Sequence, residues 1–139
     1  MFKTILLAYD GSDHAKRAAR IAKMEAEAHG ARLVVVHVYE PVPDYLGEPF
    51  FQEALKRRLE RAEKVLAEAV GLTGVPREDA LLLEGRPAEA ILEAAIGEQA
   101  DLIVMGTRGL EIRPFKTQAS KKPFQSSLQA LPQEGRNAA

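Results

Sequence analysis

Four short runs of apolar residues constrain the fold of this chain more than any other feature. They are Ile5 to Tyr9, Leu33 to Val36 with a continuation to Val38, Ala80 to Leu83, and Leu102 to Met105. The runs are continuous and do not alternate with polar residues, as strands covered on both faces in a parallel sheet do. A sheet of this kind needs helices to cover it.

The segments between these runs have helical periodicity. The first contains alanines at helical spacing and is followed by Gly30, where a left-handed C-cap would fall. The second has an apolar stripe from Phe51 to Ala69 and ends near Gly71 to Gly74, and the third begins at Pro87. The order β-α-β-α-β-α-β, with right-handed crossovers, predicts an α/β fold with a doubly wound parallel sheet sandwich.

Length and composition are those of one globular domain. The chain has 139 residues, of which 46% are hydrophobic and 28% charged. A net charge of -1 gives no general attraction to nucleic acid or to an anionic membrane. The chain has no cysteine, signal-peptide pattern or apolar stretch approaching the ~20 residues that span a bilayer. The default expectation is therefore a cytoplasmic protein.

Residues 111–139 differ from the rest of the chain. They contain five Lys/Arg and two Asp/Glu, a net charge of +3, whereas residues 1–110 have 14 basic and 18 acidic residues, a net charge of -4. They also contain prolines at 114, 123 and 132 and no valine. We therefore predict an α/β domain over residues 1–110 and an atypical C-terminal segment over 111–139, irregular or with a short helix.

Polar residues and glycines follow the first, second and fourth apolar runs, at the sheet edge where open α/β folds bind ligands. Asp10 could accept hydrogen bonds from a sugar hydroxyl or an adenine amine, although on its own a helix-capping role is the commoner one. Ser12 is a second capping candidate. Gly106 and Gly109 in "GTRG" could direct backbone N–H groups toward an anion, with added charge from Arg108, or could simply form a turn.

Other site types are disfavoured. Neither the P-loop pattern nor G-x-G-x-x-G is present, nor is the G-x-S-x-G serine elbow. His14 and His29 are expected to be solvated, and no cluster of His, Asp and Glu residues has metal-ligand spacing. A phosphorylatable receiver domain is a poor match because the first strand offers only Asp10 and the third ends at Glu84 and Gly85. We therefore expect no metal site and no catalytic nucleophile.

Four segments together resemble the universal stress protein family. They are "FKTILLAYDGSDHAKRAARIAKMEA", "LVVVHVYEP", "EGRPAEAILEAA" and "ADLIVMGTRG", in order and at suitable separations over residues 1 to about 110. The resemblance implies a parallel sheet of order 3-2-1-4-5 and, usually, a homodimer. For this chain it gives the order 3-2-1-4 and does not decide whether a fifth strand is present. The family contains ATP-binding and non-binding classes.

The resemblance to the ATP-binding class also implies a set of nucleotide-binding residues. Asp10 would contact the ribose or adenine, with Ala8 and Val38 lining the adenine slot. The phosphates would be approached by Gly106, Gly109 and Ser120. Met105 and Arg108 complete the predicted set. The chain departs from the family motif at Ala119, which stands where the third glycine is expected, and in Lys121 to Ala139, which lack the family's final strand.

The leading hypothesis is a domain that binds or senses an adenine nucleotide, ATP with or without Mg²⁺, in a stress response. No placed general base or carboxylate pair is visible in the sequence, so we expect little or no catalysis and at most slow ATP hydrolysis. The main alternative is a dimerising adaptor of the same family that binds no nucleotide. An adenylating enzyme of related architecture is a third.

Overall fold

The computed structural model describes residues 2–106 and 111–114. A five-stranded sheet lies at its centre, with strand order β3-β2-β1-β4-β5. The strands are β1 (Thr4–Ala8), β2 (Arg32–Tyr39), β3 (Ala80–Glu84), β4 (Leu102–Met105) and β5 (Glu111–Pro114). The first four are parallel, which confirms the predicted sheet and its order 3-2-1-4.

The fifth strand, whose presence the sequence did not decide, is short and antiparallel. It pairs with β4 so that Met105 lies opposite Glu111 and Leu102 opposite Pro114. For residues 111–114 this corrects the expectation of an irregular chain or a short helix. The edge of β4 would otherwise present unpaired backbone groups, and proline is tolerated in an edge strand. The remainder of the C-terminal segment, from residue 115 onward, lies outside the described residues.

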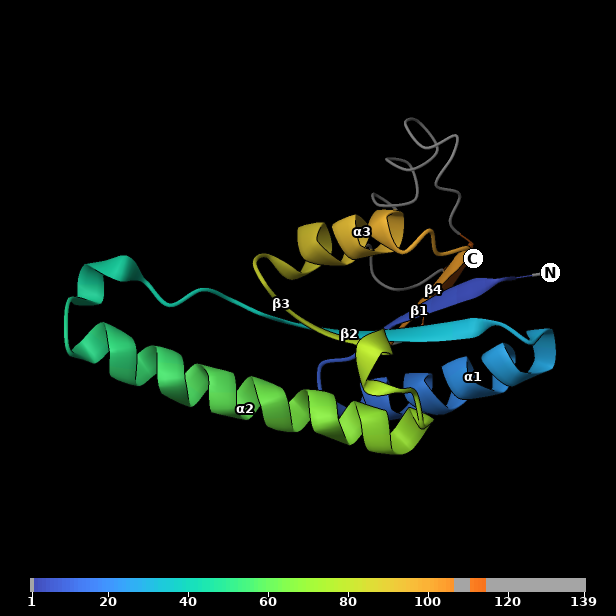
Figure 1. The fold of residues 1–139 in the computed structure, drawn as a ribbon, viewed down its shortest axis with the longest axis horizontal. Helices are drawn as coiled ribbons and strands as arrows, with labels where there is room; N and C mark the ends of the chain where they lie inside the picture. Colours follow the sequence, from blue (N-terminus) through green and yellow to red (C-terminus); the bar gives the residue numbers. More distant parts are fainter. Residues whose placement is uncertain (1, 107–110, 115–139) are drawn as a thin grey trace.

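Helices cover both faces of the sheet. Figure 1 shows α1 (Asp13–His29) and α2 (Phe50–Thr73) on one face and α3 (Pro87–Gly97) on the other. Two short 3-10 helices, η1 (Asp44–Leu46) and η2 (Arg77–Asp79), precede α2 and β3. The three main helices and Pro87 at the start of α3 agree with the sequence prediction.

The alanine-rich face of α1 is buried, as its spacing predicts. Its buried residues are Ala15, Ala18, Ala19, Ala22 and Ala26, and they pack with side chains of β1 and β4. Small side chains allow the helix to lie close to the sheet. The helix ends at Gly30, which has the left-handed conformation (φ 63°) expected of a C-cap glycine.

The core has two parts, one on each face of the sheet. Ile5, Leu7 and Val104 belong to the part covered by α1 and α2. Leu6 and Ile103 belong to the part covered by α3. Consecutive strand residues therefore enter different cores, which explains why the strands are continuously apolar.

Helix α2 is longer than the strands it covers. Its amino-terminal half and η1 extend beyond the end of the sheet (Figure 1). The Arg58 guanidinium donates hydrogen bonds to the carbonyl oxygens of Glu40 (2.7 Å) and Pro41 (3.1 Å), which ties the loop after β2 to this helix. Tyr45 and Phe50, near the tip of this extension, are 83% and 62% exposed.

Candidate functional site

The carboxyl ends of β1 and β4 lie side by side. Ala8 is opposite Met105 on β4 and opposite Val36 on β2. After β1 the chain continues to β2 on one side of β1, whereas β4 lies on the other side of β1. The order of the strands therefore reverses at this point. Ligands of open α/β sheets bind at such a point.

Three predicted residues, Ala8, Val38 and Met105, are half-buried at this edge. Val38 and Met105 pack at the border of the core covered by α3. Ala8 and Met105 are register partners, so their side chains project from the same face of the sheet. The fold thus brings these three residues of the predicted nucleotide-binding set onto one face, where they form a partly accessible apolar surface.

Asp10 is exposed and lies two residues beyond the end of β1. Its Oδ1 atom accepts a hydrogen bond from the backbone N–H of Ser12 (2.9 Å). The helix cap is Ser12, whose Oγ accepts from the N–H of Ala15 (3.1 Å). The capping role that the sequence alone favoured for Asp10 is therefore wrong, since the carboxylate stabilises a turn before the helix.

Tyr9 holds this turn in place and was missed by the sequence analysis. Its side chain is only 2% exposed, and its hydroxyl donates to Glu68 Oε1 on α2 (2.6 Å). Its backbone N–H donates to the carbonyl of Val36 (2.9 Å), and its own carbonyl accepts from His37 Nδ1 (2.8 Å). Burial, and then the hydrogen bond to Glu68, raise the pKa of the Tyr9 hydroxyl. Asp10 therefore follows a residue fixed at three points.

Gly106 lies against the first turn of α1. A Cβ atom added to it would be 2.3 Å from the backbone carbon of His14 and 2.6 Å from the nitrogen of Ala15. Only glycine permits this approach. The first glycine of "GTRG" therefore has a packing role, which applies whether or not an anion binds nearby. Arg108, Gly109 and Ser120, with Ala119, lie outside the described residues.

The expectation of solvated histidines is wrong. His14 is half-buried, and its Nδ1 atom is buried with no hydrogen-bond partner within the described residues. The end of β4 lies directly against this turn, which the local sequence does not reveal. His29 is also half-buried, with its ring 4.8 Å from that of Phe2 and its Nε2 3.4 Å from Glu25 Oε1.

Residues 2–106 and 111–114 contain no group of three or more His, Asp or Glu side chains that could hold a metal ion. Each helix in this part of the chain is too short or too polar to cross a membrane.

The comparisons with known proteins agree with the fold and the sequence motifs. The model of the universal stress protein family matches residues 1–126. The chain belongs to this family. The match extends past residue 110, where the resemblance of the sequence motifs ends.

Individual relatives support the same assignment. A universal stress protein of Thermus aquaticus is 88% identical over 110 residues, which cover 79% of this chain and 80% of the relative. The structure of a universal stress protein family member from Burkholderia pseudomallei is 33% identical, with a TM-score of 0.60 over 76% of this chain and 81% of that chain. A universal stress protein from Archaeoglobus fulgidus in complex with dAMP is 28% identical, with a TM-score of 0.51 over 76% and 82%.

Proposed function

We propose that this protein binds an adenine nucleotide at the carboxyl edge between β1 and β4 and acts as a nucleotide sensor in a stress response. The observation that carries the proposal is the structural similarity to the Archaeoglobus protein that binds dAMP. The half-buried apolar surface of Ala8, Val38 and Met105, next to the Asp10 carboxylate, supplies the chemistry an adenosine needs.

Each residue has a distinct role in this proposal. The apolar side chains contact the adenine ring. Asp10 accepts a hydrogen bond from a ribose hydroxyl or the adenine amine while its Oδ1 keeps the turn to Ser12. Arg108, Gly109 and Ser120 are proposed to approach the phosphates, and ATP, with or without Mg²⁺, is the proposed physiological ligand. The proposal includes a cytoplasmic location, a homodimer and little or no catalysis.

Isothermal titration with ATP and with dAMP, each with and without Mg²⁺, tests the proposal. Wild-type protein is expected to bind at least one of the two nucleotides, and mass spectrometry is expected to find adenine nucleotide in the purified protein. Asp10→Asn is the informative variant because asparagine retains the Oδ1 acceptor for Ser12. Loss of a charged hydrogen bond, worth about 1.5–3 kcal/mol, corresponds to at least a tenfold weaker affinity.

Asp13→Asn is the matched control. Asp13 is also an exposed aspartate at the start of α1, three residues further along the chain, and it pairs with Lys16 at 3.8 Å. Its replacement is expected to leave nucleotide affinity unchanged. Equal affinities of wild-type protein and Asp10→Asn would show that Asp10 does not contact the nucleotide. Failure of the wild-type protein to bind either nucleotide would overturn the proposed function.

The second candidate is an adaptor that binds other proteins and no nucleotide. The extension formed by η1 and the start of α2 favours it, because Tyr45 and Phe50 are large, exposed aromatic residues. Aromatic residues are enriched at protein interfaces. If correctly folded protein bound no nucleotide in the titrations, this candidate would be favoured.

A further inference from the structure

The turn after β1 and the chain that leaves β2 border the candidate site, and both are attached to one face of α2. Gly11 of the turn lies against this helix, since a Cβ atom added to it would be 3.5 Å from the side chain of Val65. The Nη1 atom of Arg58 donates to the carbonyl oxygens of Glu40 (2.7 Å) and Pro41 (3.1 Å) after β2. Arg58 and Val65 are about two helical turns apart, so they project from the same face of α2. The helix therefore fixes the two segments relative to one another.

The chain that leaves β2 depends on Arg58 for its position. Pro41 and Pro43 have no backbone N–H, so this segment can donate few hydrogen bonds of its own. Glu40 and Pro41 are exposed, whereas Arg58 is half-buried. A guanidinium presents its donors in a fixed plane, and hydrogen bonds from a charged group are stronger than those from a neutral one. Arg58 therefore acts as a clamp on the two carbonyl oxygens.

The clamp lies close to backbone groups of β2 that face the candidate site. The N–H of Tyr9 donates to the carbonyl of Val36 (2.9 Å). Alternate residues of a strand direct their backbone groups to the same neighbour, so those of Val38 also face the β1 side. The pairing of β1 with β2 ends at Ala8 and Val36, so no residue of β1 pairs with Val38. The fold therefore places a backbone donor and acceptor beside the half-buried apolar side chain of Val38.

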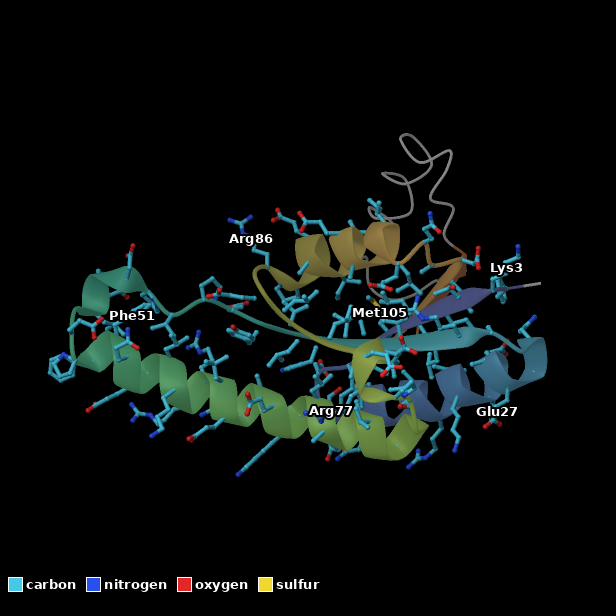
Figure 2. The ribbon with its side chains drawn as sticks, in the orientation of Figure 1. Lys3, Glu27, Phe51, Arg77, Arg86 and Met105 are labelled. Atoms are coloured by element: carbon cyan, nitrogen blue, oxygen red, sulfur yellow. The ribbon has the colours of Figure 1, made fainter. Side chains whose placement is uncertain are left out.

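Arg58 also lies at the level along α2 at which a ligand of this edge would sit. Figure 2 shows Phe51 in the extension, beyond the end of the sheet. Val65, by contrast, contacts the turn that follows β1. Arg58 is seven residues from each of them, which places it roughly 10 Å along the helix from Val65, at about 1.5 Å per residue. It is therefore just beyond the carboxyl edge, where ligands of open α/β sheets bind.

We propose that Arg58 is a positioning residue that makes the site selective for adenine over guanine, a role that rests on the proposed function. An apolar surface binds the ring of either purine. The two differ where adenine has an amino donor and guanine has an oxygen acceptor, so polar groups held in fixed positions distinguish them. By clamping Glu40 and Pro41, Arg58 holds Val38, two residues before Glu40, at the distance from the turn after β1 that the purine requires.

Isothermal titration with ATP and with GTP tests this role. Wild-type protein is expected to bind ATP at least about tenfold more tightly than GTP, the effect of one hydrogen bond held in place. Arg58→Met has a side chain of similar length without a donor. It is expected to bind ATP about tenfold more weakly than wild-type protein and GTP equally well, so that the selectivity is lost. Arg58→Lys keeps a charged donor and is expected to retain part of the selectivity.

Arg57→Met is the matched control, because Arg57 is the neighbouring arginine of the same helix and is exposed. It is expected to leave the affinities for both nucleotides unchanged. Hydrogen exchange of the backbone amide of Val42, which is 6% exposed, reports on the clamp without nucleotide. This amide is expected to exchange faster in Arg58→Met than in wild-type protein and at the wild-type rate in Arg57→Met.

The outcomes separate this role from the proposed function. Wild-type protein that binds neither nucleotide would overturn both. Wild-type protein that binds ATP and GTP equally would overturn the selectivity alone. Arg58→Met with the wild-type ratio of the two affinities would overturn the role of Arg58, including the case in which both affinities fall together, as a purely structural role predicts. Circular dichroism establishes that each variant is folded, and if Arg58→Met does not fold, the ratio measured for Arg58→Lys decides the question.

Discussion

Among the described glycines, Gly106 is the one at which an added methyl group would meet the closest neighbouring atoms. The Cβ of an alanine at this position would be 2.3 Å from the backbone carbon of His14, 2.4 Å from its oxygen and 2.6 Å from the nitrogen of Ala15. All three are backbone atoms in the first turn of α1, so they cannot rotate away as a side chain would. Gly106→Ala must therefore separate α1 from the end of β4.

The cost of this separation follows from the packing at the contact. Inserting a methyl group into a well-packed region typically costs about 1–3 kcal/mol. Ala15 and Val104, which flank the contact, are 1% and 0% exposed, so the shift would also disturb the core between α1 and β4. We expect Gly106→Ala to lower the free energy of unfolding by about 3 kcal/mol. For a domain of this size that corresponds to a fall in Tm of roughly 10 °C.

Urea denaturation followed by circular dichroism measures the effect. The midpoint should fall while the m-value stays constant. Gly71→Ala is the matched control, because Gly71 lies within α2 and a Cβ there would meet no atom within 4 Å. Alanine at that helical position is expected to stabilise the protein by about 0.5–1 kcal/mol. Equal stability of Gly106→Ala and wild-type protein would refute the argument from close packing.

Two further predictions concern the residues around the turn at Asp10. Ser12→Ala removes the Oγ acceptor for the N–H of Ala15 and is expected to cost about 1 kcal/mol, whereas Ser12→Asp, which keeps a capping oxygen, should cost less than half as much. Urea midpoints of the two variants compare them, and an equal loss would argue against the cap. Tyr9→Phe removes the hydrogen bond to Glu68 and is expected to cost about 1 kcal/mol at pH 8. Because the folded protein raises the pKa of Tyr9 above its ordinary value of 10.0, the contribution of the neutral hydroxyl is complete below pH 10 and is lost as the pH rises above it. The stability difference between wild-type protein and Tyr9→Phe should therefore shrink above pH 10, and a constant difference up to pH 11 would contradict this reasoning.

The features that the sequence predicted correctly depend on local patterns. The spacing of the alanines in α1 identifies its buried face because helical periodicity is a property of neighbouring residues. The capping glycine at position 30 and the proline at the start of α3 are likewise local signals. The continuous apolar runs identified the four parallel strands since each strand is covered on both faces.

The features that the sequence missed depend on contacts between distant residues. The hydroxyl of Tyr9 meets a carboxylate 59 residues away in the sequence. Gly106 contacts the backbone of His14 and Ala15, which lie near the other end of the sequence. Neither has a local signature. The segment Glu111–Pro114 has no apolar run, so its strand forms through pairing with the edge of β4 and not through intrinsic propensity.

The candidate site shows how a binding motif and a structural requirement can share the same residues. Gly106 is needed for packing against α1, and the Asp10 carboxylate stabilises the turn before that helix. The presence of these two residues is therefore explained even in a protein that binds no nucleotide. Loss of nucleotide from a Gly106 variant would accordingly not identify a phosphate contact, because the same change moves the first turn of α1. Asp10→Asn separates the two roles, since asparagine keeps the Oδ1 acceptor for Ser12 and replaces the other carboxylate oxygen, which a bound ribose or adenine would meet, with an uncharged NH2 donor.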